Sequence, residues 1–247
     1  MAVDSTPLVR LERVRKEFRA VVALEELTLD VKAGEIVALV GDNGAGKSTV
    51  VKCMAGVYPP TSGQILLERE PVHFSSPLDA RSHGIEVVFQ DLALANAQPV
   101  YMNMFLGREL VTGRLQRLDR EAMAAETQVL LDELDVRIDS PGQTIRELSG
   151  GQRQGVAIAR AMHWARRLVL MDEPTAALGL AETLRVEELI RRMRDQGQAI
   201  LIVSHSLDQV FRLADRICVL RRGRQVGLRR TSETTGDEIV AMITGLR

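Results

Sequence analysis

The chain has 247 residues, which is long enough for one α/β domain with a second, smaller lobe. Charged residues make up 26% of the sequence and hydrophobic residues 45%, as is typical of globular proteins. The formal net charge is −1, and because nucleic-acid-binding proteins usually have a basic excess, this balance argues against a nucleic-acid partner. One basic cluster is better explained as the solvated surface of a strand pair. It consists of Arg221, Arg222, Arg224, Arg229 and Arg230.

The sequence gives no sign of secretion or of insertion into a membrane. No apolar run approaches the roughly 20 residues of a membrane-spanning helix. The first five residues do not resemble a signal peptide. Cys53 and Cys218 are far apart and lie in apolar runs, which favours buried thiols in a reducing compartment over a disulfide or a metal site. We therefore expect a cytoplasmic protein that contacts a membrane only through a partner.

The order of the predicted elements indicates an α/β fold. Two segments near the N-terminus alternate as exposed antiparallel strands do, and a continuous apolar run that ends in glycine is typical of a buried central strand. A helix should follow that run directly. In chain order, the first expected elements are strands at 8–14, 24–31 and 34–40, a helix at 46–55, and strands at 63–68 and 85–89.

A different composition begins at about residue 91. Residues 91–147 are rich in Leu, Met, Ala, Arg and Glu, and residues 121–134 have helical spacing. We expect a mostly helical lobe here, inserted into a core made of residues 1–90 and 148–247. The core should continue with a helix at 149–161, a strand at 167–171, a helix at 181–194, a strand at 199–203, a hairpin of strands at 216–220 and 224–228, and a helix at 237–243. The sequence contains no internal repeat.

A glycine-rich segment ending in Lys47 and Ser48 follows the buried strand predicted at 34–40. Its pattern and its place between a strand and a helix are those of a phosphate-binding loop. The glycines let backbone N–H groups surround β- and γ-phosphates, and the helix N-terminus adds partial positive charge. Lys47 would contact the phosphates and Ser48 would offer its hydroxyl to Mg²⁺. The residues assigned to nucleotide binding here are Gly41, Asp42, Asn43, Gly44, Ala45, Gly46, Lys47, Ser48 and Thr49.

Two acidic residues end the buried strand predicted at 167–171. Asp172 would support Mg²⁺, and Glu173 would polarise the attacking water as a general base. An acidic strand end is common in α/β proteins and would be weak evidence alone. Beside a phosphate loop it predicts nucleotide hydrolysis, because we expect these two strands to be neighbours in the sheet, as in a phosphate-loop fold.

A Ser-Gly-Gly-Gln turn begins the helix predicted at 149–161, and it consists of Ser149, Gly150, Gly151 and Gln152. Its hydroxyl, its backbone N–H groups and the helix N-terminus would form a second phosphate-binding surface. An ordinary serine-capped helix would explain the first residue of the turn but not the whole set of motifs.

Together these motifs resemble those of the nucleotide-binding subunit of an ABC (ATP-binding cassette) transporter, and the resemblance covers nearly the whole chain. It implies a single ABC ATPase domain over residues 1–247, with a phosphate-loop NTPase core of the RecA-like type. An antiparallel β subdomain and an inserted α-helical subdomain would complete the fold. ATP and Mg²⁺ are the implied ligands. In the family the Ser-Gly-Gly-Gln turn faces the phosphate loop of a different cassette, which implies head-to-tail pairing with a second ATPase subunit, as a homodimer.

The resemblance assigns roles to further residues. Gln90, at a strand end before the lobe, matches the glutamine that touches the metal or its water and links the lobe to the site. His205 matches the switch histidine, which senses the γ-phosphate and holds Glu173 and the water in place. Phe18 suits the position of the adenine-stacking aromatic residue, with a phenylalanine of the core as the alternative. The metal contacts so implied, direct or through water, are those of Ser48, Gln90 and Asp172.

Three stretches, 72–77, 105–109 and 175–179, look like the family branch that imports ribose, xylose, fructose and similar monosaccharides. Gly179 departs from the general family pattern, because an aspartate usually stands there, and this puts communication between the two ATP sites in doubt. The implied partners are transmembrane permease subunits on the inner face of the cell membrane and, indirectly, a periplasmic or extracellular sugar-binding protein. The sugar cannot be named from this chain, because those partners contact it.

The sequence leaves other functions open. An importer for a different solute would use the same motifs. Ribosome-acting relatives contain two cassettes and a charged linker, and DNA-repair relatives contain long coiled-coil insertions, for which residues 91–147 are too short. A phosphate-loop kinase would leave the turn at Ser149 unexplained.

Overall fold

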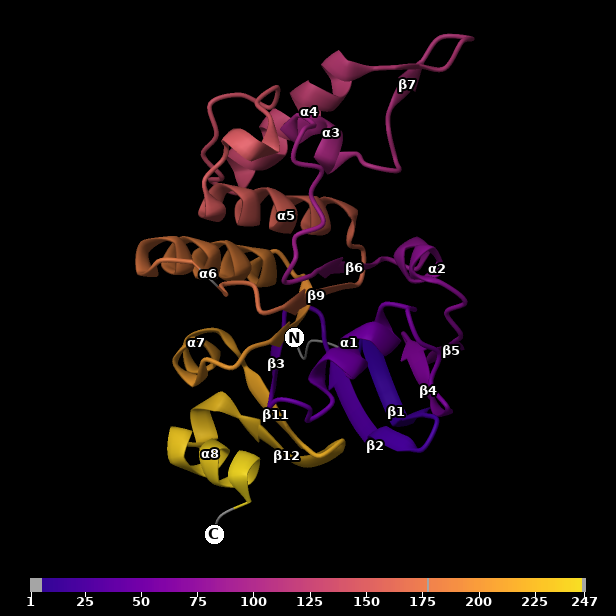
Figure 1. The fold of residues 1–247 in the computed structure, drawn as a ribbon, viewed down its shortest axis with the longest axis vertical. Helices are drawn as coiled ribbons and strands as arrows, with labels where there is room; N and C mark the ends of the chain where they lie inside the picture. Colours follow the sequence, from indigo (N-terminus) through magenta and orange to yellow (C-terminus); the bar gives the residue numbers. More distant parts are fainter. Residues whose placement is uncertain (1–5, 177, 246–247) are drawn as a thin grey trace.

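A ten-stranded sheet runs through the molecule, and its strand order explains which loops come together (Figure 1). The computed structural model describes residues 6–176 and 178–245. The N-terminal residues 1–5, for which no signal peptide was expected, and Ala177 of the stretch 175–179 lie outside the described residues. Across the sheet the strands are β5 (Glu70–Val72), β4 (Ser62–Leu67), β1 (Val9–Phe18), β2 (Val21–Val31), β12 (Arg224–Arg230), β11 (Arg216–Arg221), β3 (Ile36–Val40), β10 (Ala199–Val203), β9 (Leu168–Asp172) and β6 (Ile85–Val88).

Five neighbouring strands, β11, β3, β10, β9 and β6, are parallel and form the central part of the sheet. The expected adjacency of the strand before the phosphate loop and the strand that ends in two acidic residues is wrong, because β10 lies between β3 and β9 and pairs with both. β3 and β10 are buried along their whole length, as their continuous apolar sequences predict. Because side chains alternate between the two faces of a strand, Ile36, Ala38 and Val40 pack in one core cluster while Val37 and Leu39 pack in the other. The sheet is therefore covered on both faces.

Strands β5, β4, β1 and β2 form an antiparallel part in which β1 pairs with both β2 and β4. β12 joins the two parts, because it pairs with β2 in parallel and with β11 antiparallel. β1 and β2 extend well beyond the predicted segments 8–14 and 24–31, so that Phe18 ends β1. Register shifts between Leu11 and Val14, and again after Val14, interrupt the alternation of buried and exposed residues, and this explains why the sequence pattern stopped early.

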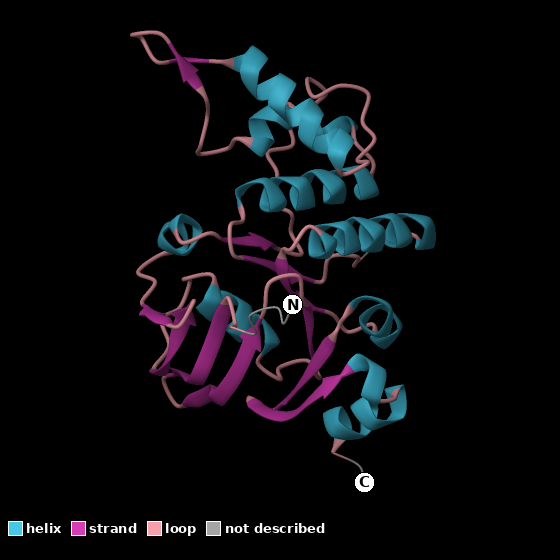
Figure 2. Ribbon diagram, turned by 180° about the vertical axis from the view of Figure 1, so that it is seen from behind, coloured by secondary structure: helices cyan, strands magenta, loops and turns pink. Residues whose placement is uncertain are grey.

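Eight α-helices lie in the described residues, and most of them flank the sheet (Figures 1 and 2). They are α1 (Lys47–Met54), α2 (Pro77–Ser82), α3 (Val100–Met104), α4 (Arg120–Glu133), α5 (Gly150–Trp164), α6 (Leu180–Asp195), α7 (Leu207–Leu213) and α8 (Gly236–Thr244). Short 3-10 helices occupy Ile145–Glu147 and Thr231–Glu233. Among the described helices, none combines the length and the apolar composition that crossing a bilayer would require.

The segment expected to be a helical lobe contains α3 and α4 at one end of the molecule (Figure 1). It also contains long connections and a two-stranded hairpin of β7 (Val111–Thr112) and β8 (Arg117–Leu118), which its composition did not reveal. α5 follows this segment in sequence, yet it packs against α3 and α4 as well as against α6 and β6. α5 therefore lies between the lobe and the sheet.

Candidate functional site

The carboxyl ends of four parallel strands bring part of the predicted site to one edge of the sheet, namely the glycine-rich loop, Asp172, Glu173, His205 and Gln90. β3 leads into the glycine-rich loop at Gly41, and β9 ends at Asp172 with Glu173 directly after it. β10 leads to His205, and β6, the last strand of the sheet, leads to Gln90. Ligands of open parallel sheets bind at this edge, so distant parts of the sequence meet where a ligand is expected.

Two glycines of the loop between β3 and α1 are required by close packing. Gly41 has a φ of 152°, and a Cβ there would collide with the carbonyl oxygen of Leu220. Gly46, just before α1, has a φ of 106°, and a Cβ there would lie 2.7 Å from the carbonyl oxygen of Ala23. The loop is therefore held tightly over β2 and β11, with the N-terminus of α1 at its end. The other assigned residues lie in this loop or the first turn of α1: Asn43, Gly44, Ala45, Ser48 and Thr49.

Lys47, the first residue of α1, turns its ammonium group back onto this loop. Its Nζ donates hydrogen bonds to the carbonyl oxygens of Gly41 and Asp42, at 2.6 and 2.9 Å. Burial lowers the pKa of Lys47, and the negative charges of Glu173, Asp172 and Asp42 oppose that shift. The cation is therefore close to the acidic end of β9, where phosphate oxygens could replace the carbonyl oxygens as its partners.

The two carboxylates at the end of β9 have different surroundings. Burial raises the pKa of Asp172, the charge of Glu173 raises it further, and Lys47 and Lys52 oppose the shift. Glu173 has a φ of 54°, in the left-handed region that residues other than glycine rarely adopt. Its N–H donates to the carbonyl oxygen of Val203 at 2.9 Å, so a backbone bond to β10 holds this costly conformation.

The carboxylate of Glu173 is paired with the imidazole of His205. The distance from His205 Nδ1 to Glu173 Oε2 is 2.6 Å. The Glu173 side chain is only 17% exposed, whereas that of His205 is 73% exposed. A carboxylate oriented in this way is suited to accept a proton from water, and the exposed ring remains accessible to a ligand at the sheet edge.

A buried amide that the sequence did not reveal connects the loops after β9 and β10. Gln209, in α7, is 2% exposed. Its Nε2 donates to Thr175 Oγ1 at 2.7 Å, and its Oε1 accepts from the hydroxyl of Ser204 at 2.9 Å. Ser204 Oγ also accepts from the N–H of Ser206, at 3.1 Å. A single buried glutamine follows no period or motif, so only the structure identifies it.

Gln90 is exposed and lies at the junction between the core and the lobe. The segment after it is fastened to lobe-side helices. Arg160 of α5 donates to the carbonyl oxygens of Leu92 and Ala93, at 3.1 and 3.2 Å. Asn103 of α3, which is fully buried, binds the same segment through both atoms of its amide. A movement of the lobe would therefore be transmitted to the segment next to Gln90.

The turn at the head of α5 is closed by its own side chains. The Ser149 hydroxyl accepts from the N–H of Gln152 at 3.2 Å, and Gln152 Oε1 accepts from the N–H of Ser149 at 2.9 Å. Gly150 and Gly151 lie between them, and the N–H of Gly151 donates to Glu182 Oε1 at 3.3 Å. Reciprocal capping accounts for Ser149 and Gln152, but it does not require the two glycines.

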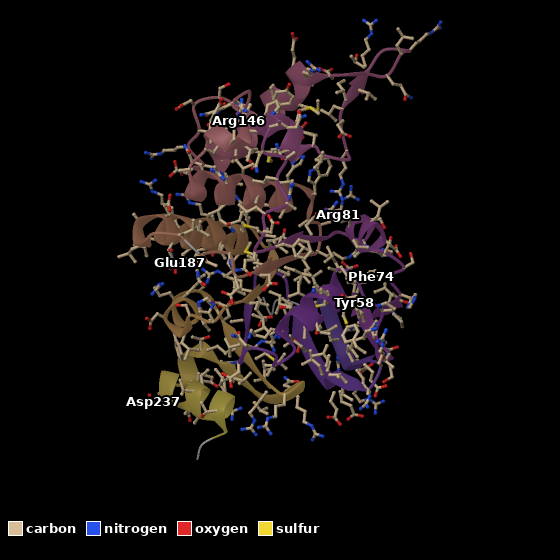
Figure 3. All side chains as sticks on the ribbon, in the orientation of Figure 1. Tyr58, Phe74, Arg81, Arg146, Glu187 and Asp237 are labelled. Atoms are coloured by element: carbon tan, nitrogen blue, oxygen red, sulfur yellow. The ribbon has the colours of Figure 1, made fainter. Side chains whose placement is uncertain are left out.

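Phe18 lies at the surface, with 37% of its area exposed, so the alternative of a core phenylalanine is not supported. Its ring meets that of Tyr58 edge to face, with the centroids 5.0 Å apart, and Lys16 Nζ lies 5.1 Å from its centroid. Figure 3 shows Tyr58 on the β-rich side of the molecule. An exposed aromatic face of this kind is able to stack on a planar base.

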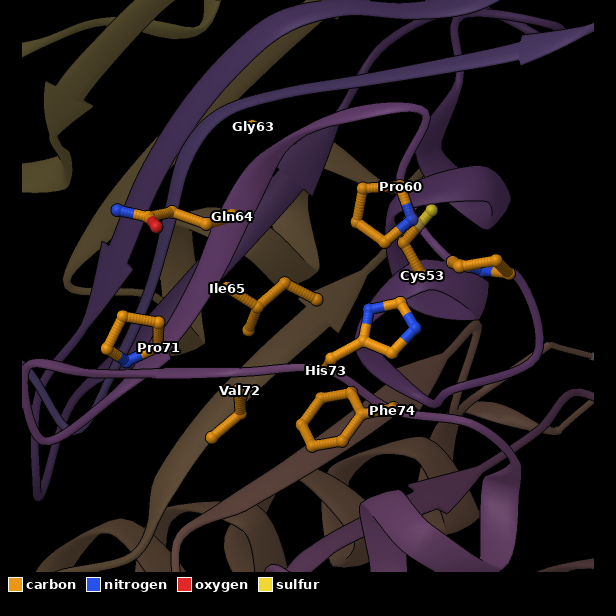
Figure 4. A pocket seen from close by; sticks show the side chains of 10 residues that line it. Cys53, Pro60, Gly63, Gln64, Ile65, Pro71, Val72, His73 and Phe74 are labelled. Atoms are coloured by element: carbon orange, nitrogen blue, oxygen red, sulfur yellow. The ribbon is translucent and has the colours of Figure 1, made fainter.

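A cavity of about 270 Å³ lies on the same side of the molecule (Figure 4). Its lining includes Cys53, Ile65, His73 and Phe74. Cys53 belongs to the last turn of α1, whereas the glycine-rich loop precedes the first turn. None of the predicted site residues lines this cavity, and we assign it no part in nucleotide binding.

Comparison with known proteins identifies the family. The model of the ABC transporter family matches residues 24–176. The xylose/arabinose import ATP-binding protein XylG of Sulfolobus acidocaldarius is 44% identical over 96% of this chain and 94% of its own length. The fructose import ATP-binding protein FrcA of Rhizobium meliloti is 43% identical over 98% of this chain and 95% of its own length. A ribose import ATP-binding protein of Escherichia coli O157:H7 is 42% identical, and this chain spans 47% of it.

Solved structures show the same fold. An ATP-binding cassette of an ABC transporter in its ADP conformation has a TM-score of 0.83 at 23% identity, covering 98% of this chain and 96% of that one. The cassette cbiO1 of Clostridium perfringens has a TM-score of 0.80 at 26% identity, with coverage of 98% and 96%. The predicted phosphate-loop NTPase fold and the resemblance to the sugar-importing branch are thus confirmed. The chain belongs to the ABC transporter family.

Proposed function

We propose that this chain is the ATP-binding and ATP-hydrolysing subunit of an importer for a monosaccharide such as xylose, fructose or ribose. The observation that best supports hydrolysis is the 2.6 Å pairing of Glu173 with His205, close to the cation of Lys47. Strained and electrostatically perturbed groups gathered at one sheet edge are typical of a reactive site. The class of solute rests on the relatives, which are named for xylose, arabinose, fructose and ribose import.

In this proposal the glycine-rich loop surrounds the β- and γ-phosphates of ATP, and Lys47 exchanges its carbonyl partners for phosphate oxygens. Phe18 stacks on the adenine. Ser48, Asp172 and Gln90 offer hydroxyl, carboxylate and amide oxygens, which are the hard donors that Mg²⁺ prefers, so the donor set fits this ion. When bound there, Mg²⁺ would offset negative charge on the phosphates.

Glu173 accepts the proton of the attacking water, and its ionised form is needed for this role. His205 keeps the carboxylate in place through Nδ1 and contacts the γ-phosphate from its exposed side. Gln209 acts at a distance from the reacting atoms. By binding Thr175 and Ser204 it fixes the distance between two loops, one that follows Glu173 and one that contains His205.

The turn at Ser149 acts in this proposal on ATP bound to a second copy of the chain. Leu180 and Leu184 lie one turn apart at the head of α6 and are 77% and 47% exposed, which favours a protein partner on that surface. Two copies paired head to tail would complete two sites, as a homodimer. Permease subunits would receive the resulting movement, and a sugar-binding protein would deliver the sugar to them. The chain would then work in the cytoplasm, on the inner face of the membrane.

The test is reconstitution of the chain with the membrane protein that co-purifies with it, followed by uptake of labelled xylose, fructose and ribose into vesicles. We expect ATP-dependent uptake of at least one of these sugars.

The Glu173→Gln variant should lose both uptake and hydrolysis but still bind ATP, because the base is lost and the phosphate loop is intact. Lys47→Ala should instead weaken ATP binding itself, as measured by calorimetry.

Hydrolysis by Glu173→Gln at the wild-type rate would contradict the assigned role of that residue. Co-purification with ribosomes or DNA in place of a membrane protein would favour a non-transport ATPase. Uptake of another class of solute would correct only the choice of sugar.

A further inference from the structure

Glu182 connects the head of α5 to the loop that precedes α6. Its Oε1 accepts from the N–H of Gly151 at 3.3 Å, and its Oε2 accepts from the N–H of Gly179 at 3.3 Å. Glu182 lies in the first turn of α6 and is partly buried. One carboxylate thus bridges the Ser-Gly-Gly-Gln turn and the position at which the family usually has an aspartate.

The two segments fit closely around this carboxylate. A Cβ on Gly151 would lie 3.0 Å from Glu182 Cγ and 3.1 Å from its Cδ, so a larger residue there would push the Glu182 side chain aside. A Cβ on Gly150 would lie 3.5 Å from the side chain of Leu178. The turn and the loop are therefore connected through Glu182, which binds both, and a shift of one would displace this carboxylate from the other.

The negative charge of Glu182 lies where the partner's ATP is proposed to dock. The carboxylate is next to the N-termini of both α5 and α6, where the helix dipoles favour an anion. A phosphate docking on the turn would need the same kind of N–H donors and would meet a like charge. Glu182 therefore occupies part of the surface on which the partner's ATP is proposed to dock.

We propose that Glu182 is a positioning residue that holds the turn and the Gly179 loop together in the unpaired subunit and opposes docking of the partner's ATP until it is displaced. This inference rests on the proposed function, in which the turn binds the γ-phosphate of a second copy. Displacement of Glu182 by phosphate frees the N–H of Gly179 at the same moment. Binding of the partner's ATP at the Ser-Gly-Gly-Gln turn is thereby communicated to the loop at Gly179. The backbone N–H of Gly179 takes part in this communication, although the residue lacks the carboxylate that the family usually has there.

A simpler role for Glu182 would be to cap α6, because an acidic residue or glutamine in the first turn commonly binds the N–H at the start of the helix. Glu182→Gln separates the two roles. The glutamine amide keeps one acceptor oxygen for a cap, but it removes the negative charge and replaces the second acceptor oxygen with an NH2 group, which can only donate. Glu188→Gln is the matched control. It makes the same change of charge on the same helix, where Glu188 pairs with Arg191 and Arg192.

The first experiment measures the dissociation constant of the dimer in ATP by analytical sedimentation. It uses the Glu173→Gln subunit, which we expect to bind ATP without hydrolysing it. We expect added Glu182→Gln to lower the dimer dissociation constant roughly fivefold to tenfold, because two like charges per dimer no longer oppose the docking phosphates. Added Glu188→Gln should leave that constant unchanged. A helix-capping role alone would leave the dimer dissociation constant unchanged, because glutamine can also cap the helix.

The second measurement uses the hydrolysing enzyme with Glu182→Gln or Glu188→Gln alone. Easier pairing should lower the KM for ATP of Glu182→Gln several-fold with kcat little changed. If the Glu173→Gln subunit does not dimerise in ATP at all, the proposed function is at fault. If it dimerises, and Glu182→Gln matches Glu188→Gln in both the dissociation constant and KM, the role inferred for Glu182 is wrong.

Discussion

At the scale of single residues, Asp172 is a group that destabilises the fold at neutral pH. Burial and the neighbouring Glu173 raise its pKa, so the folded chain holds this proton more tightly than the unfolded chain does. The ionised carboxylate therefore costs stability above the folded-state pKa, and that cost disappears as the pH falls below the unfolded-state value. We expect Asp172→Asn to raise the melting temperature at neutral pH, with a gain that shrinks toward acidic pH.

The control for this prediction is Asp237→Asn, because Asp237 is an exposed aspartate at the start of α8 (Figure 3). Thermal unfolding in the absence of nucleotide should show no gain for that variant at any pH. Equal melting temperatures for Asp172→Asn and the unsubstituted protein at neutral pH would contradict the prediction.

Gln209 is a second residue whose effect can be isolated. Gln209→Met fills a similar volume but leaves the hydroxyls of Thr175 and Ser204 without their partner. We expect a loss of about 1–3 kcal/mol of stability and roughly a tenfold fall in kcat, with ATP affinity unchanged. Since Thr175→Val removes the same bond from the other side, the two substitutions should be strongly non-additive in kcat. Additive effects would show that the amide does not act through Thr175.

At the scale of secondary-structure elements, Arg160 makes α5 a connection between the lobe and the segment after Gln90. Arg160→Ala removes the two hydrogen bonds to Leu92 and Ala93, so backbone amides in residues 91–99 should exchange hydrogen faster. In the assembled complex, sugar-stimulated ATPase should fall while the basal activity of the subunit alone is kept. The control is Arg146→Ala on the exposed surface of the lobe (Figure 3), which should change neither measurement. Unchanged exchange in Arg160→Ala would contradict the connection.

The elements themselves show what the sequence could and could not predict. Buried parallel strands such as β3 and β10 are continuous apolar runs, and these were located to within a residue or two. The predicted strand at 8–14 is shorter than β1, because register shifts in β1 break the alternation of buried and exposed residues on which the prediction depended. The hairpin β7–β8 has only two residues in each strand, too few for any period to be seen.

The site divides in the same way. Lys47, Glu173 and Ser149 belong to motifs of fixed local spacing, so the sequence names them directly. Glu182 and Gln209 act through contacts made between separate loops, and these depend on how α6 and α7 pack. A local pattern can suggest that Glu182 caps α6, but it does not reveal the bond to Gly151 or the partners of Gln209, and a structure is needed to find these contacts.

At the scale of the whole assembly, composite sites can be tested by mixing two inactive variants. Lys47→Ala should fail at its own phosphate loop, and Ser149→Arg should block the turn that faces the partner. In a mixed dimer both defects fall on one site, and the other site is wild type. If one intact site hydrolyses ATP alone, mixing should restore roughly a quarter of the wild-type rate, since about half of the dimers are mixed. Activity of either variant as a verified monomer would contradict head-to-tail pairing.

The position of α5 has a mechanical consequence. Its 15 residues make a rod of about 22 Å, with the turn at Ser149 at one end and Arg160 near the other. If the rod pivots by roughly 10° about one end, the opposite end is displaced by about 4 Å, which exceeds the length of a hydrogen bond. A modest tilt therefore acts as an all-or-none signal, because contacts at the far end are broken outright. For a given tilt, the displacement of the far end is proportional to the length of the helix. Inserting or removing one turn of α5 would therefore change the coupling between its two ends, even with every side chain of the site in place.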